Sequence, residues 1–165
     1  MLTKKKIVKI TILGFLLLCL YGIIFGFSGQ DGTESSGLSS SLTIAILQFF
    51  RIVPKADFTI EQLTLIENME HFIRKAGHFS EYAAMGMLTF GIFSTLSQKL
   101  KKCFRFSILW VFVSAAADEF HQYFVPGRWA SFLDVLLDTC GGFTGAGIVL
   151  LIVLLINKKA HSLDQ

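Results

Sequence analysis

The sequence is poor in charged residues, in proline and in cysteine. Only 16% of its 165 residues are charged, against about 25% in soluble domains, and it holds two prolines and three cysteines. So few charges argue against a water-soluble globule, because a small soluble domain needs a large polar surface. The scarcity of proline and of long charge runs excludes a disordered chain. The formal net charge of +3 is too small to indicate a nucleic-acid partner.

Apolar residues are abundant instead. They make up 53% of the chain, 17 of them are phenylalanine, and the mean hydropathy is +0.61. A transmembrane helix needs about 20 mostly apolar residues. Four segments meet or approach that length: residues 7–27, 74–96, 104–124 and 131–156. The length and composition therefore predict a single all-α domain over residues 1–165, a polytopic membrane bundle of four transmembrane helices.

The distribution of lysine and arginine predicts the orientation of this bundle. With a cytoplasmic N-terminus and four crossings, ten of the fifteen basic residues fall on the cytoplasmic side. This bias places both termini in the cytoplasm. None of the cysteines falls in an outer loop, so we expect no disulfide.

The long outer loop, residues 28–73, divides into three parts. Residues 28–41 are rich in glycine and serine, which is typical of an irregular, solvated segment. Residues 42–53 are apolar but too short to span, which predicts an interfacial or re-entrant helix that Pro54 ends. An amphipathic pattern begins at Thr59, which is a candidate N-cap, and this helix is expected to cover the bundle or lie on the outer leaflet.

Ionisable residues inside the last three segments lie at matching depths. Ionisable groups in a membrane are costly, so each is a candidate for function. At a helical rise of ~1.5 Å per residue, one layer lies roughly 5 Å and a second roughly 10 Å from the outer ends. Glycines beside the acidic stripe of residues 134–145 allow close helix packing, so the stripe faces protein. We therefore predict a polar pocket, open to the outside, whose candidate binding residues are Arg74, Lys75, His78, Glu81, Asp118, Glu119, His121, Gln122, Arg128, Asp134 and Asp138.

Three hypotheses explain such a pocket. In the first, the charges only hold the bundle together, through the pairs Arg74–Glu81, Arg128–Asp134 and His121–Asp118. In the second, the pocket binds a polar head group at the outer leaflet. Arg74, Lys75 and Arg128 would then hold phosphate or carboxylate, and His78 and Glu81 would bind sugar or amine groups. The pocket carries more acids than bases, which counts against a purely anionic ligand.

In the third hypothesis the excess acid binds a divalent metal. Asp118 and His121 are one helical turn apart and suit zinc or manganese. Glu81 would be the general base and His78 a second candidate catalytic residue in metal-assisted hydrolysis or transfer at a lipid head group. A two-ligand spacing is a weak signature, so the choice between binding and catalysis stays open. The sequence leaves protein partners undetermined.

Three blocks of sequence resemble the VanZ-like family of small bacterial membrane proteins. They are RKAGHFSEY at residues 74–82, DEFHQYFVPGR at residues 118–128, and the Asp-x-x-x-Asp…Gly-Gly block at residues 134–142. The stretch at residues 27–30 also looks like the start of the family's outer loop. Order and spacing match over most of the chain.

The resemblance implies a bacterial plasma membrane and a role in the cell envelope. The founding member of the family is associated with low-level resistance to teicoplanin, a lipoglycopeptide that binds cell-wall precursors. The implied partner is therefore a membrane lipid or a cell-wall precursor, and the implied phenotype is altered glycopeptide susceptibility. The family has no settled enzymatic mechanism, so the resemblance does not decide between head-group binding and metal-assisted catalysis.

Overall fold

The computed structural model of the protein describes residues 2–163, except the side chains of residues 32–36, 38 and 160–163. Within that part every regular element is a helix. The five helices are α1 (Lys4–Ser28), α2 (Gly32–Phe49), α3 (Ile60–Leu96), α4 (Leu100–Gln122) and α5 (Phe132–Leu163). The prediction of an all-α chain is confirmed.

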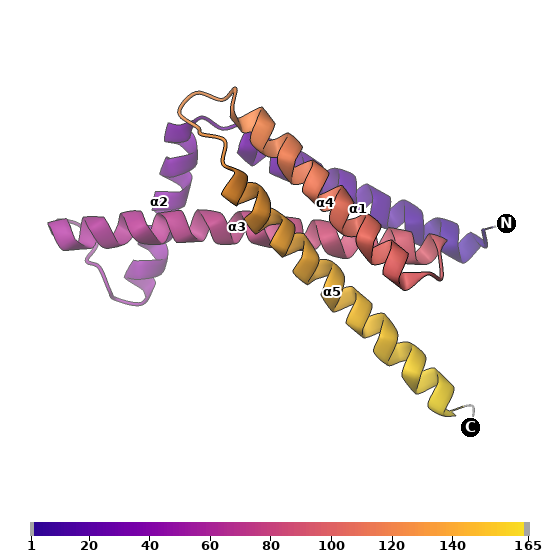
Figure 1. The fold of residues 1–165 in the computed structure, drawn as a ribbon. Coiled ribbons are helices and arrows are strands. Elements are labelled where there is room, and N and C mark those ends of the chain that lie inside the picture. Colours follow the sequence, from indigo (N-terminus) through magenta and orange to yellow (C-terminus); the bar gives the residue numbers. More distant parts are fainter. Residues whose placement is uncertain (1, 164–165) are drawn as a thin grey trace.

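The central element is α3, which packs against each of the other four helices (Figure 1). Thr59 caps its N-terminus with a capping box: its hydroxyl accepts from the Gln62 backbone N–H, and the Gln62 side chain accepts from the Thr59 N–H. The predicted N-cap is therefore confirmed. No proline interrupts the 37 residues of α3, so the amphipathic segment and the second apolar segment form one helix.

The prediction of an irregular segment at residues 28–41 is wrong for most of its length, because α2 begins at Gly32. The apolar end of α2 packs on α3 through the buried side chains of Leu47, Val53 and Ile66. The Ser40 hydroxyl donates to the Glu70 carboxylate of α3. Such tertiary packing outweighs the weak helix propensity of glycine and serine.

The end of α2 also differs from the prediction. The helix stops at Phe49, before Pro54, where Arg51 has a left-handed φ of 58°. The Ile52 N–H donates to the Leu47 carbonyl at 2.8 Å, across this turn. A left-handed residue just past the last turn satisfies free carbonyls and stops a helix without proline.

Two of the helices are long and apolar enough to cross a membrane: α1 over Lys4–Ser28 and α5 over Phe132–Lys159. Only 6% of the apolar window of α1 and 22% of that of α5 are buried in the protein. Helices this apolar and this exposed need lipid around them rather than water. The other two predicted spans, residues 74–96 and 104–124, lie in α3 and α4, which carry more charge.

Glycines allow α5 to cross α3 at close range (Figure 1). A Cβ added at Gly141 would overlap the Phe79 carbonyl oxygen, and one added at Gly145 would overlap that of Ala83. The predicted close packing along this stripe is therefore confirmed. Direct backbone contact between two helices is possible only where no side chain lies between them.

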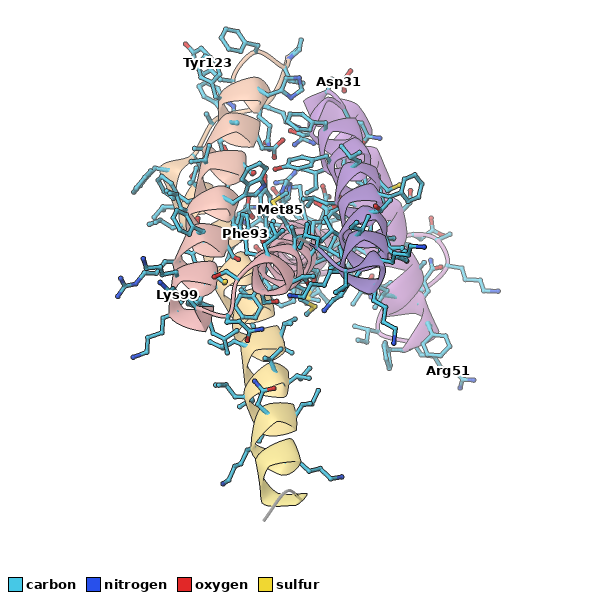
Figure 2. The ribbon with its side chains drawn as sticks, turned by 90° about the vertical axis from the view of Figure 1, so that its right-hand side faces the viewer. Asp31, Arg51, Met85, Phe93, Lys99 and Tyr123 are labelled. Carbon is cyan, nitrogen blue, oxygen red and sulfur yellow. The ribbon has the colours of Figure 1, made fainter. Side chains whose placement is uncertain are left out.

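The core of the bundle is formed by α1, α3, α4 and α5 around Tyr82 and Met85, which are completely buried. Figure 2 shows Met85 in the middle of the bundle and Tyr123 and Asp31 at one end of it. That end holds the C-terminus of α1, the α4–α5 connection and the first turns of α5. We call it the Arg128 end.

Candidate functional site

The connection between α4 and α5 is a tight turn that places Arg128. Gly127 has a φ of 74°, and the Arg128 N–H donates to the Val125 carbonyl at 3.2 Å. Proline at the second position and a left-handed glycine at the third suit a type II β-turn. Val125-Pro126-Gly127-Arg128 has that arrangement, so the local sequence explains why the arginine projects from this point.

The Arg128 guanidinium ties three segments together. It donates to the Phe27 carbonyl at 3.0 Å, to the Gln30 carbonyl at 3.1 Å and to the Gln122 side-chain oxygen at 3.1 Å. The Phe27 carbonyl belongs to the last turn of α1, where helix carbonyls lack intrahelical partners. Arg128 therefore holds the end of α1 against α4, a structural role that the sequence did not indicate.

A cavity of about 390 Å³ lies at the Arg128 end, between α3, α4 and α5. Eight of the eleven predicted binding residues line it. The predicted residues that line it are Arg74, Lys75, His78, Glu119, Gln122, Arg128, Asp134 and Asp138. Residues distant in sequence thus meet at one cavity.

Cationic groups surround the rim of this cavity. Partial burial lowers the pKa of Arg128 and the nearby Arg74 charge lowers it further, while Asp118 and Glu119 raise it. Arg74 is half-buried and its guanidinium lies 3.2 Å from the His71 ring nitrogen Nδ1. Arg74 and Arg128 therefore both bring positive charge to the lining of the cavity.

Part of the acid in the cavity already has a partner. Lys75 forms an ion pair with Asp134. Glu119 accepts from the Ser131 backbone N–H at 2.8 Å, at the residue before the first turn of α5. These two contacts hold α5 to α3 and to α4.

The floor of the cavity is acidic and deeply buried. The Asp138 side chain is 0% exposed, and neither of its oxygens has a hydrogen-bond partner among the described protein atoms. The His78 Nδ1 atom is 3.9 Å from Asp138 Oδ2, which is too long for a hydrogen bond. Behind them, Asp118 accepts from Gln122 at 3.0 Å through one oxygen only. The Tyr82 hydroxyl, also fully buried, lacks a partner in the described part of the chain.

The three predicted residues that do not line the cavity are Glu81, Asp118 and His121. The His121 ring packs edge-on against Phe25 of α1, with 5.7 Å between ring centroids. His121 therefore faces α1, whereas its predicted partner Asp118 bonds to Gln122. Among the residues that the structure describes, no group of three or more histidine, cysteine, aspartate or glutamate side chains is arranged to hold a metal ion.

The first hypothesis named ion pairs that differ from those observed. Asp134 pairs with Lys75, and the histidine nearest a buried carboxylate is His78. The sequence argument also missed cavity residues. His71 lies three residues before Arg74 on the same helix face, so helical spacing could have revealed it. Ser131 and Leu137 carried no such signal, because the α4–α5 turn sets their positions.

The fold and the cavity together define a class of protein. The chain is an all-α protein with exposed apolar helices of membrane-spanning length and a polar, dipolar cavity at one end of its bundle. A model of the VanZ/LLP1 family matches residues 13–154. The chain belongs to this family, as its three sequence blocks indicated. No curated protein and no solved structure matches the chain.

Proposed function

We propose that the chain binds the polar head group of an envelope lipid or cell-wall precursor in the cavity at the Arg128 end. In this proposal the protein crosses the bacterial plasma membrane four times, through α1, α3, α4 and α5. Both termini are cytoplasmic and the cavity opens at the outer leaflet. The excess of lysine and arginine at the opposite end of the bundle supports this orientation.

The separation of charge within the cavity carries the proposal. Arg74 and Arg128 lie at the rim, whereas the carboxylate of Asp138 lies at the floor without a hydrogen-bond partner. Ion pairs that only hold a bundle together bring opposite charges into contact, as Lys75 and Asp134 do. A cavity of about 390 Å³ that keeps them apart suits a small polar ligand bound between them.

The test replaces Arg74 by glutamine, because its one described contact is with a neighbouring residue of the same helix. Arg105→Gln is the matched control, since Arg105 is exposed near the opposite end of the bundle. Both variants are purified in mild detergent, and bound lipids are identified and quantified by mass spectrometry. Arg74→Gln should lose a specific lipid with a phosphate or carboxylate in its head group that the wild type and Arg105→Gln retain. Equal lipid content in all three proteins would contradict the proposal.

The orientation has its own measurement. Single cysteines replace Ser97, at the start of the α3–α4 connection, and Trp129, in the α4–α5 connection, in a chain without its three native cysteines. A membrane-impermeant maleimide added to intact cells should label position 129 and not position 97. Labelling at both positions or only at 97 would contradict four crossings with a cytoplasmic N-terminus.

The alternative remains a metal-assisted hydrolase or transferase that acts on an envelope lipid. In that proposal Asp118 and His121 hold zinc or manganese, and Glu81 and His78 carry protons. Elemental analysis of the wild type beside His121→Ala tests it directly. Near-stoichiometric metal that the variant loses would favour catalysis, and its absence after metal is supplied would exclude this ligand pair.

A change in glycopeptide susceptibility is a further consequence of the proposal. A cavity that binds a cell-wall precursor competes with teicoplanin for the same molecule or alters its exposure. Expression of the wild type should then raise the inhibitory concentration of teicoplanin, and Arg74→Gln should not. If both proteins raised the inhibitory concentration equally, the resistance would not depend on ligand binding in the cavity.

A further inference from the structure

We infer that the bound head group is zwitterionic, with an anionic group at the arginine rim and a primary ammonium group at Asp138. This inference rests on the proposed function and names the chemical class of its ligand. The ammonium enters the floor of the cavity, between α3 and α5, and the anionic group stays at the rim beside Arg74.

The carboxylate of Asp138 is the starting point. Asp138 lines the cavity, is 0% exposed, and both its oxygens lack a hydrogen-bond partner among the described atoms. A buried carboxylate without hydrogen bonds is costly, and hydrogen-bond donors from a ligand offset that cost. The side chains nearest to it supply none, because His78 lies 3.9 Å away and Lys75 pairs with Asp134.

The residues around Asp138 favour a positively charged ligand group. Asp118 and Glu119 on α4, Glu81 on α3 and Asp134 on α5 act on it electrostatically, and all of them are acidic. A neutral or anionic ligand group would leave this acid uncompensated. A cation placed here is attracted by every one of these groups, which is the electrostatic complement that binding sites provide.

The carboxylate oxygens at the floor of the cavity favour a cation that can donate hydrogen bonds. A primary ammonium has three N–H donors. Asp138 lines the cavity, and both of its oxygens are buried acceptors without a partner in the described part of the chain. A quaternary ammonium carries the same charge but no N–H group, so it cannot satisfy them. The cavity should therefore distinguish phosphoethanolamine from both phosphocholine and phosphoglycerol head groups.

The experiment titrates detergent-solubilised protein with three short-chain lipids that share acyl chains and phosphate: phosphatidylethanolamine, phosphatidylcholine and phosphatidylglycerol. Binding is measured by native mass spectrometry. The wild type should bind phosphatidylethanolamine about tenfold more tightly than either other lipid, as expected for charge-assisted hydrogen bonds to a buried carboxylate.

Asp138→Asn removes the charge and keeps the shape of the side chain. It should abolish the preference for phosphatidylethanolamine and leave the three lipids binding alike. Asp57→Asn is the matched control, because Asp57 has a left-handed φ of 59° that asparagine tolerates and lies outside the cavity. This control should keep the wild-type preference.

The outcomes separate this inference from the proposed function. If all three lipids bind the wild type equally and Arg74→Gln weakens all of them, the head-group function stands and the zwitterionic ligand is refuted. Tighter binding of phosphatidylglycerol refutes the inference in the same way. If none of the three lipids binds above the level of nonspecific lipid attachment, both the proposed function and the zwitterionic ligand are refuted. The comparison of the three lipids uses only the wild-type protein, so it tests the zwitterionic ligand even if Asp138→Asn does not fold.

Discussion

Replacing Gly145 by alanine should separate α3 from α5 and disturb the cavity at Asp138, seven residues or roughly 10 Å away along the same helix. The residue is buried at the helix crossing, where an added Cβ would overlap the Ala83 carbonyl oxygen. This neighbour is a backbone atom, which cannot rotate aside as a flexible side chain can. The two helices must therefore move apart by on the order of 1 Å, because packed interiors have no spare volume.

The magnitude follows from two opposing effects. Alanine in place of glycine stabilises a helix interior by about 1 kcal/mol. Overpacking a well-packed site costs about 1–3 kcal/mol, or more where backbone is displaced. Gly147 separates the two effects, because an added Cβ there meets nothing within 4 Å. Gly147→Ala should be neutral or stabilising. The gain in helix propensity is common to both variants, so Gly145→Ala should be less stable than Gly147→Ala by the overpacking cost alone, about 1–3 kcal/mol.

The assay is thermal unfolding of the purified variants in one detergent. For a chain of this length about 1 kcal/mol shifts Tm by roughly 2–4 °C, so the two variants should differ by roughly 2–12 °C. The lipid preference should weaken in Gly145→Ala, because His78 and Asp138 lie on the two helices that separate. Equal Tm values for the two alanine variants would falsify the crossing geometry.

Three further predictions concern single contacts. Arg128→Lys should lower the free energy of unfolding by about 2 kcal/mol, because one ammonium cannot reach three separate acceptors; an unchanged Tm would contradict this role. Thr59→Ala should destabilise the start of α3 by about 1 kcal/mol and speed proteolysis in residues 50–59, read by intact-mass analysis of the fragments. Lys75→Met should change stability by less than about 1 kcal/mol, because its ion pair with Asp134 is about one-third exposed; a larger loss of Tm would show that the pair holds α3 to α5.

The helical class and the membrane character could be predicted because they depend on local composition. The runs at residues 7–27 and 131–156 contain enough apolar residues to be recognised without knowing their neighbours, and α1 and α5 contain them. The capping box at Thr59 was equally local, since an N-cap is read from residues within one turn. The helix over residues 32–41 was missed because its stability comes from α3, which is remote in sequence.

The candidate site was predicted in part, for a related reason. Helical spacing placed Arg74 and His78 on one face, and both line the cavity. Spacing alone also grouped His121 with Asp118. In the structure, however, the His121 ring packs against Phe25 of α1 and not beside Asp118. A helix face is a local property, whereas the partner that a face meets depends on how whole helices cross.

Composition and periodicity by themselves determined the kind of protein this is: helical, apolar and charged at few, clustered positions. Which of these charges have partners depends on how the helices pack in three dimensions. Arg128 is bound to the end of α1, Lys75 is paired with Asp134, and Asp138 is buried without a hydrogen bond from the described chain. The physical reason is that the energy of a charge depends on its distance to other groups within a few ångströms. In this fold those distances are set by the α3–α5 crossing and the turn at Gly127.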